Sequence, residues 1–181
     1  AIFYKKNKWS AGSAGHFSLS ETPEQLGTKS WNTSNTRMCT WVTFKSQAGV
    51  EFAAFNTHLD HISEEAQQKG MELIRERMKQ FRAHTGLPVV LTGDFNVEPA
   101  NAVIQGLEQE GYRNAYSVLH LENKEVGATF HNFLGGESGE PIDYIFVSPD
   151  LQIQNVTVDR ELYGGRYPSD HYPVIAEVSP V

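Results

Sequence analysis

Four short segments combine Asp, Asn and His side chains at the ends of apolar stretches. They are 56–60 (Asn-Thr-His-Leu-Asp), 93–96 (Gly-Asp-Phe-Asn), 142–144 (Ile-Asp-Tyr) and 169–171 (Ser-Asp-His). Strand ends and the loops after them are where rigid scaffolds commonly present functional groups. Carboxylate oxygens suit a hard cation such as Mg²⁺, and His and amide N–H groups suit phosphate oxygens. The segments are therefore candidates for chemistry on phosphate.

Asp94 and Asn96 stand two residues apart, directly after an apolar stretch at 89–92. In an extended backbone, residues at this spacing point the same way, so a carboxylate and an amide would converge on one spot. The alternative is a simple turn, because Gly-Asp-x-Asn is also favourable turn chemistry. Spacing alone leaves both interpretations open.

Asp170 and His171 precede the last predicted strand, and adjacent side chains of an extended segment diverge. Asp170 could hold a metal or take a proton, while His171 could donate to a phosphoryl oxygen. Ordinary capping at a strand entry is the alternative. Asp143 lies in a strongly apolar stretch, and a buried Asp must be paired. Its partner is either a structural Arg or a His whose tautomer it fixes.

His58 ends a predicted strand at 50–58, and its simplest interpretation is a satisfied core or edge histidine. Asp60 and His61 raise the alternative of a zinc cluster, which the lack of further Cys and of a helical His pair disfavours. Other loops supply candidate substrate contacts, although a solvated surface or loop-anchoring role is the alternative for each. These candidates are Arg37, Arg166, Tyr167, Phe130 and His131.

The predicted elements indicate a layered domain built around a sheet. One strong helix spans about 63–84, capped by Ser63 and ended by Gly86, and a shorter helix starts near 99. The apolar residues on the buried face of the long helix are Met71, Ile74, Met78 and Phe81. Strands are predicted at 1–4, 40–44, 50–58, 89–92, 142–147, 151–158 and 174–178, with short strands and a long surface loop over 10–35.

Composition fits one globular domain over 1–181 and excludes several classes of protein. The formal charge of -7 argues against binding nucleic acid by bulk charge alone. The single Cys39 excludes a disulfide framework and a Cys-based zinc cluster. No apolar run approaches the roughly 20 residues of a membrane span. No signal peptide opens the chain, and the localisation and oligomeric state stay open.

The four segments, in this order and spacing, together resemble the endonuclease/exonuclease/phosphatase superfamily. The motifs are Asn56-Thr57-His58-Leu59, Thr92-Gly93-Asp94-Phe95-Asn96, the stretch 142–147 and Ser169-Asp170-His171-Tyr172-Pro173. The segments 1–6, 18–23 and 37–41 look closest to a bacterial subgroup. The resemblance implies an α+β fold, a four-layer α/β/β/α sandwich of two mixed sheets, and hydrolysis of a phosphoester with Mg²⁺ or Mn²⁺.

The resemblance also implies roles for individual residues. Asp94 would orient the attacking water or bind on the phosphate side, and Asn96 would contact a phosphate oxygen. His58 resembles a general acid, and His171 resembles the histidine that stabilises the phosphoryl charge, oriented by Asp143. The implied metal carboxylates are Asp170 and Asp94.

The family has upstream motifs, an early Asn and a Gln-Glu pair, that the chain lacks; Glu21 and Glu51 stand in other contexts. We therefore expect a C-terminal fragment that misses N-terminal strands. A non-catalytic module that binds phosphate or a partner is the alternative function, and a zinc hydrolase using His58, Asp60 and His61 ranks below both. The expected partner is a phosphorylated small molecule, a nucleotide or a lipid head group; nucleic acid is possible but not favoured.

Overall fold

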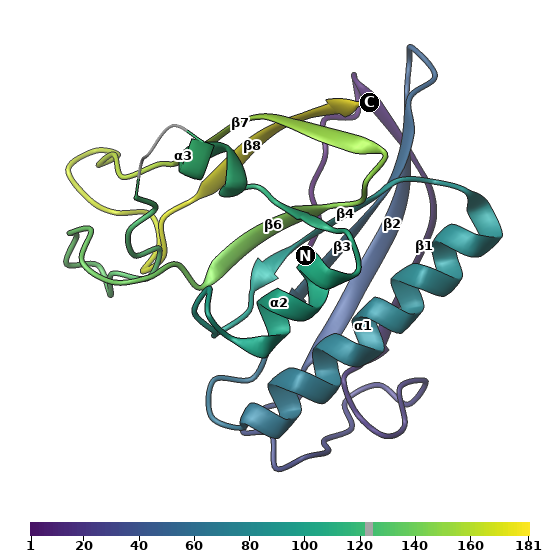
Figure 1. Cartoon of the computed structure of the whole chain (residues 1–181), viewed down its shortest axis with the longest axis horizontal. Helices are drawn as coiled ribbons and strands as arrows, with labels where there is room; N and C mark the ends of the chain where they lie inside the picture. The colour runs from purple at the N-terminus through teal and green to yellow at the C-terminus, as the bar shows by residue number, and fades with distance from the viewer. Residues whose placement is uncertain (122–124) are drawn as a thin grey trace. The chain divides into compact units, whose positions relative to one another are not determined.

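A computed structural model describes residues 1–121 and 125–181 of the chain. The chain forms two compact units, residues 1–96 and residues 97–181, and each is described by itself. The expected single-domain organisation stays a prediction. Figure 1 shows the course of the chain, with the first unit in purple to teal and the second in green to yellow.

The first unit is built on four neighbouring strands in the order β1-β2-β3-β4. They are β1 (Trp9–Ser18), β2 (Met38–Ser46), β3 (Glu51–His58) and β4 (Val89–Asp94). β1, β2 and β3 pair antiparallel, whereas β3 and β4 pair parallel. The parallel pair places the carboxyl ends of β3 and β4, with their polar segments, at one edge of the sheet.

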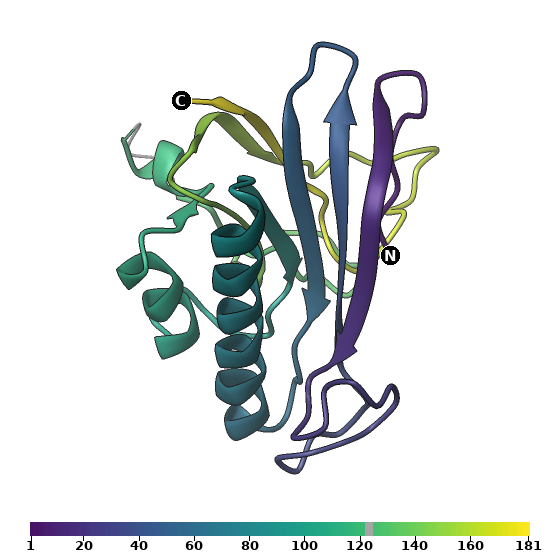
Figure 2. The ribbon, with the colours of Figure 1, turned by 90° about the vertical axis from the view of Figure 1, so that its right-hand side faces the viewer.

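The long helix α1 (Glu64–Thr85) connects β3 to β4 and runs alongside the strands (Figure 2). The Ser63 hydroxyl accepts a hydrogen bond from the Ala66 N–H at its start, and Gly86 ends it with a left-handed backbone. The predicted face is confirmed, because Met71, Ile74 and Met78 are buried. The Phe81 ring lies 5.4 Å from the Trp41 ring and 5.7 Å from the Phe55 ring, which fixes the helix on the sheet.

The start of the chain differs from the expectation. Residues 1–4 form no strand, and a turn follows in which the Lys8 and Trp9 N–H groups both donate to the Lys5 carbonyl. The Tyr4 ring instead packs 5.1 Å from the Phe44 ring. The Gly- and Ser-rich stretch that follows forms one ten-residue strand, β1, rather than short strands in a loop. Pairing with β2 overrides the weak local preference of these small residues.

At Gly93, the strand pair β3–β4 leaves no room for a side chain. A Cβ atom at this position would lie 2.0 Å from the Thr57 carbonyl oxygen. Thr57 and Gly93 are register partners, so a side chain here would force the two strands apart. The next pair in the register is His58 and Asp94, and the glycine therefore sets the separation of two candidate site residues.

The second unit contains α2 (Ala102–Gln109), β5 (Arg113–Asn114), α3 (Ser117–Leu121), β6 (Asp143–Val147), β7 (Leu151–Val158) and β8 (Val174–Pro180). β5 pairs antiparallel with β6, and β7 pairs antiparallel with β8. α2 begins after Asn101, slightly later than predicted, and buries Val103, Ile104 and Leu107 as expected. The Tyr116 ring, directly before α3, lies 5.8 Å from the Tyr144 ring of β6.

Helices and both parallel and antiparallel strands confirm the predicted α+β class. The strand β5, of two residues, and the helix α3, of five, were not predicted, because such short segments show no hydrophobic period. Among the described residues, no helix has the length and apolar character that crossing a membrane requires.

Gly93→Ala is expected to lower the free energy of unfolding by more than about 2 kcal/mol, because the new methyl group collides with backbone rather than with a flexible side chain. Gly49→Ala is the matched control: its φ of 84° is also unfavourable for Ala, but no atom lies within 4 Å of the added Cβ. Urea unfolding of both variants measures the difference. Equal losses would contradict a steric role for the close approach at Gly93.

Cys39 is expected to be inert in the folded protein. Burial raises the pKa of its thiol to about 12, so roughly one thiol in 10⁴ is ionised at pH 8, and the residue is fully buried. A thiol reagent such as Ellman's reagent should react at pH 8 only as the chain unfolds in urea. Stoichiometric reaction in native buffer would contradict the burial.

Candidate functional site

The first unit brings His58 and Asp94 together. The parallel register of β3 and β4 makes them direct partners, and His58 Nε2 lies 3.3 Å from Asp94 Oδ2. The His58 side chain is 56% exposed and the Asp94 carboxylate 15%, so the pair opens to solvent through the imidazole. His58 is therefore no core histidine, and its ring is accessible to a ligand.

Asn96 does not project alongside Asp94 from an extended backbone, which was one of the two interpretations of its spacing. β4 ends at Asp94, and Asn96 has a left-handed φ of 51°. Its N–H donates to Asp94 Oδ1 over 2.9 Å, which is the turn chemistry that the sequence left open. The Asn96 amide Nδ2 donates to the Leu59 carbonyl over 3.1 Å. Asn96 thus ties the ends of β3 and β4 together and orients the Asp94 carboxylate.

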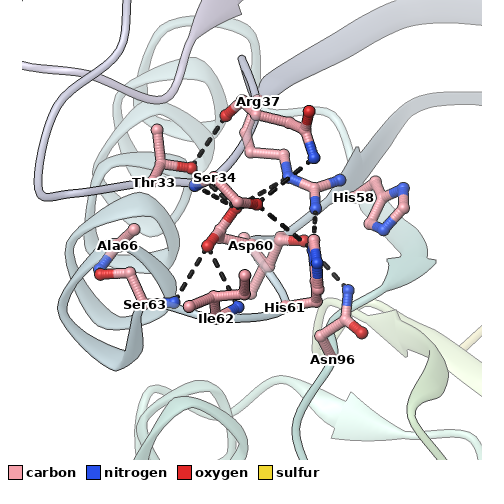
Figure 3. Close-up of polar contacts among 12 residues, drawn as sticks. Thr33, Ser34, Arg37, His58, Asp60, His61, Ile62, Ser63, Ala66 and Asn96 are labelled. Atoms are coloured by element: carbon pink, nitrogen blue, oxygen red, sulfur yellow. Dashed lines mark hydrogen bonds and ion pairs between the residues drawn. The ribbon is translucent and has the colours of Figure 1, made fainter.

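A buried carboxylate, Asp60, organises the residues after β3 (Figure 3). Its Oδ2 accepts from the backbone N–H groups of Ile62 and Ser63, at 3.1 and 2.9 Å, just before α1. Its Oδ1 accepts from the Thr33 hydroxyl over 2.8 Å and from the Ser34 hydroxyl over 2.7 Å. Asp60 therefore joins the long loop before β2 to the start of α1.

The hydrogen bonds around Asp60 decide its ionisation. Burial by itself raises the pKa of this carboxyl, but the Ser63 N–H and the Ser34 and Thr33 groups outweigh burial and hold the pKa well below its usual range. The zinc alternative for Asp60 is wrong, because both carboxylate oxygens are engaged by protein donors. The sequence suggested Asp60 only as a zinc ligand and missed its role as a hydrogen-bond hub.

Arg37 is the only sequence-predicted substrate contact in the first unit, and it is not a solvated surface side chain. Its side chain is 10% exposed, and its Nε lies 3.3 Å from Asp60 Oδ1. Its Nη2 lies 3.0 Å from His61 Nδ1, which consequently accepts the hydrogen bond. The guanidinium is held in one orientation from two sides.

The second unit brings Asp143 and His171 together, as predicted. His171 Nδ1 lies 2.7 Å from Asp143 Oδ2, and both side chains are about one-fifth exposed. A carboxylate acceptor at Nδ1 fixes a proton on that nitrogen and sets the orientation of the ring. The partner of Asp143 is therefore a histidine rather than an arginine.

Buried groups fix the Asp143 backbone. The Thr129 hydroxyl, which is fully buried, accepts from the Ile142 and Asp143 N–H groups at 3.0 and 3.2 Å. The Tyr116 hydroxyl donates to the Asp143 carbonyl over 2.6 Å. Burial, with the Asp143 charge nearby, raises the pKa of Tyr116, so the phenol stays a neutral donor. No spacing in the sequence signals either contact, because both depend on loops returning to β6.

Asp170 lies at the crossing of two loops of the second unit. Its carbonyl accepts from the N–H groups of His131 and Asn132, at 2.9 and 3.1 Å. Its carboxylate Oδ1 accepts from the Ser169 hydroxyl over 3.3 Å. Asp170 is only half-buried, and it directly precedes His171 in the chain.

The remaining predicted contacts divide into three kinds. Phe130 is 46% exposed, and its ring lies 5.0 Å from the His171 ring, which suits contact with a ligand. His131 is buried and stacks 3.8 Å from the Tyr172 ring, with Tyr167 edge-on at 4.5 Å. His131 and Tyr167 therefore anchor loops. Arg166 is exposed, and its backbone pairs with that of Tyr163 in a turn.

Comparison with known proteins gives the class to which this arrangement belongs. The model of the endonuclease/exonuclease/phosphatase family matches residues 22–171, which is most of the chain. The chain belongs to this family, as the motifs predicted.

Solved structures confirm the family's α+β sandwich fold. An endonuclease/exonuclease/phosphatase family protein from Bacteroides thetaiotaomicron is 33% identical with a TM-score of 0.87, over 97% of this chain and 67% of that chain. A mannosyl-6-phosphatase from the same organism is 33% identical with a TM-score of 0.86, over 97% of this chain and 69% of that one. The human Nocturnin catalytic domain, at 17% identity and a TM-score of 0.76, shares the fold over 98% of this chain and 62% of that one.

Among curated proteins, Nocturnin from Drosophila melanogaster is 29% identical over 72% of this chain. The chain spans 26% of that protein's length.

The depressed pKa of Asp60 predicts a stability that depends on acid. A carboxyl whose folded pKa lies below its unfolded pKa contributes stability above the unfolded value, near pH 4, and loses it as pH falls toward the folded value. Asp60→Asn should lower the unfolding free energy at pH 7, and the gap from the wild type should shrink below about pH 4. Urea unfolding between pH 2.5 and 7 tests this, and a gap that stays constant with pH would contradict it.

Proposed function

We propose that this chain carries the catalytic residues of a phosphoester hydrolase that depends on a divalent metal. The observation that carries the proposal is the 2.7 Å contact between His171 Nδ1 and Asp143 Oδ2 in a member of this family. A histidine fixed at Nδ1 by a carboxylate presents Nε2 in a defined direction, which suits donation to a phosphoryl oxygen.

In this mechanism, Asp143 accepts the hydrogen bond from Nδ1 of the His171 imidazolium and holds the ring in one orientation. His171 Nε2 donates to a phosphoryl oxygen as negative charge develops there. Thr129 and Tyr116 keep the Asp143 backbone in place, so that the donor needs no rearrangement during the reaction. Phe130, beside His171, contacts the group that carries the phosphate.

The first unit supplies the proton chemistry in this proposal. Asp94, oriented by the Asn96 N–H, takes the proton of the attacking water. His58, whose imidazole is exposed, donates a proton to the leaving oxygen. Asn96 Nδ2 already donates to Leu59, so its main contribution is to position Asp94, with a direct phosphate contact as a further proposal.

The carboxylates fit Mg²⁺ or Mn²⁺, because hard cations take oxygen ligands and keep several waters. Asp94 of the first unit and Asp170 of the second unit each carry such a carboxylate, and we propose each as a residue that would bind a divalent ion. When bound, the ion would supply positive charge that stabilises the phosphoryl oxygens.

A phosphorylated small molecule is the proposed substrate. The support is the likeness to a mannosyl-6-phosphatase and the net charge of -7, which does not favour a long nucleic-acid track. A sugar phosphate, a nucleotide and a lipid head group each fit a site with an exposed aromatic ring beside the proposed phosphoryl donor.

Hydrolysis of p-nitrophenyl phosphate and bis-p-nitrophenyl phosphate, with Mg²⁺, Mn²⁺ or EDTA, tests the proposal. Turnover should need metal, and His171→Ala should lower kcat about 10² to 10³-fold, because one charge-stabilising donor is lost. Asp170→Asn should raise the metal concentration that half-maximal turnover requires. His84→Ala, at the end of α1 and outside the site, is the matched control and should keep normal turnover.

Melting temperatures of these variants separate loss of function from loss of fold. Near-normal turnover in His171→Ala would contradict the role of His171. No turnover with any metal would favour the alternative, a module that binds phosphate without hydrolysing it.

A further inference from the structure

Asp60 carries no role in the mechanism above, yet it has the densest set of hydrogen bonds near the candidate site. We propose that Asp60 is a positioning residue: it fixes the guanidinium of Arg37, which binds an anionic group of the substrate. This inference rests on the proposed function, because the anionic group is that of a phosphorylated substrate.

The position of Arg37 depends on Asp60, whereas the position of Asp60 does not depend on Arg37. Asp60 accepts five hydrogen bonds besides that of Arg37, from Ile62 N, Ser63 N, Ser34 N, Ser34 Oγ and Thr33 Oγ1. Its carboxylate would thus remain satisfied without the arginine. Arg37, in contrast, has Asp60 as its ion-pair partner while its side chain is nine-tenths buried. Loss of Asp60 would leave a buried guanidinium without its ion-pair partner, which is costly, whereas loss of Arg37 would leave the Asp60 carboxylate with its other hydrogen bonds.

Only part of the donor capacity of Arg37 is used. Nε donates to Asp60 and Nη2 to His61, which accounts for two of the five N–H donors of a guanidinium. Within 1–121 and 125–181, no hydrogen bond from Nη1 is present, and no Arg37 nitrogen is both buried and unsatisfied. The unused edge therefore reaches solvent. A planar, fixed and partly desolvated guanidinium edge suits a phosphate oxygen pair.

The position of Arg37 places this edge beside the proton chemistry. Arg37 directly precedes β2, where Cys39 pairs with Thr57 of β3, so Arg37 lies next to the end of β3 at His58. In Figure 3 the guanidinium lies between the Asp60 carboxylate and the His58 ring. An anion bound by Arg37 would therefore sit next to the exposed imidazole of His58.

Asp60 holds both elements that define the position of Arg37. One oxygen binds the backbone at the start of α1, and the other binds the loop residues Thr33 and Ser34. The Ser63 hydroxyl adds a bond to the Trp31 carbonyl of the same loop. The guanidinium is consequently fixed relative to the helix and to the loop, so little conformational entropy is lost when an anion binds.

A double-mutant cycle on binding of inorganic phosphate, measured calorimetrically with the whole chain in EDTA, tests the proposal without requiring turnover. Arg37→Gln should weaken binding about 10- to 100-fold, the effect of one hydrogen bond to a charged group. Asp60→Asn should weaken it by a similar factor. Asp60→Asn should add little in the Arg37→Gln background, because Asp60 acts through Arg37.

Two controls separate positioning from structural damage. Thr33→Val removes one donor to Asp60 but leaves the Arg37 contact, so it should lower the melting temperature and keep wild-type phosphate affinity. Arg77→Gln removes a guanidinium that pairs with Glu24 on the surface of α1, and it should also keep wild-type affinity. If Asp60→Asn does not fold, Arg37→Lys carries the test, since a flexible ammonium keeps the charge but loses the fixed fork; it should bind as weakly as Arg37→Gln.

Additive losses in the cycle, or wild-type affinity in Arg37→Gln or Arg37→Lys, would overturn the proposal. Hydrolysis of p-nitrophenyl phosphate by the same proteins distinguishes the two failures. If the two mutations are coupled in phosphate binding but the chain shows no metal-dependent turnover, the proposed function is wrong and the positioning role stands. If the chain shows metal-dependent turnover but the two mutations have additive effects on phosphate binding, the positioning role is wrong and the proposed function stands.

Discussion

The close approach of β3 and β4 at Gly93 is the constraint on which the first half of the candidate site depends. The two strands are parallel partners, and the absence of a side chain at Gly93 lets the Thr57 carbonyl lie where a Cβ would be. The next register pair is His58 and Asp94, so their 3.3 Å contact follows from the backbone. Parallel strands need a long crossover between them, and α1 supplies it. The contact between His58 and Asp94 therefore depends on the register of the two strands, and that parallel register depends on the crossover helix.

Hydrogen bonding of buried carboxylates and hydroxyls then fixes the loops that the strands leave undetermined. Asp60 joins the loop before β2 to the start of α1, and Thr129 joins the loop after α3 to the start of β6. Both groups are buried, where an unmet hydrogen bond would be costly, so the loops have few alternative conformations. Each unit thereby presents a His–carboxylate pair on backbone held from two sides, which is what preorganised stabilisation of a phosphoryl charge requires.

Much of this arrangement could be predicted from the sequence, but only where a local period or an ordered motif was present. The helix face of Met71, Ile74 and Met78 and the apolar strand before Asp94 follow from such periods. The pairing of Asp143 with His171 was expected from the family motifs and from the cost of an unpaired Asp. The left-handed Asn96 and the buried Arg37 were not predicted, because spacing does not reveal backbone handedness or burial. His131 and Tyr167 likewise pack against Tyr172 through contacts that no local pattern signals.

The sequence by itself determined the family, the α+β class, the long helix and the set of chemically competent residues. These depend on residue type, local hydrophobic period and the order of short motifs, all of which are written along the chain. The tertiary structure decided which of those residues are held by hydrogen bonds within the protein. It made Asp60 a hydrogen-bond hub rather than a zinc ligand, and Asn96 a turn residue that orients Asp94. The physical reason is that hydrogen-bond saturation and burial arise from residues distant in the sequence, such as Thr33 and Ser63 around Asp60, which meet only when the chain is folded.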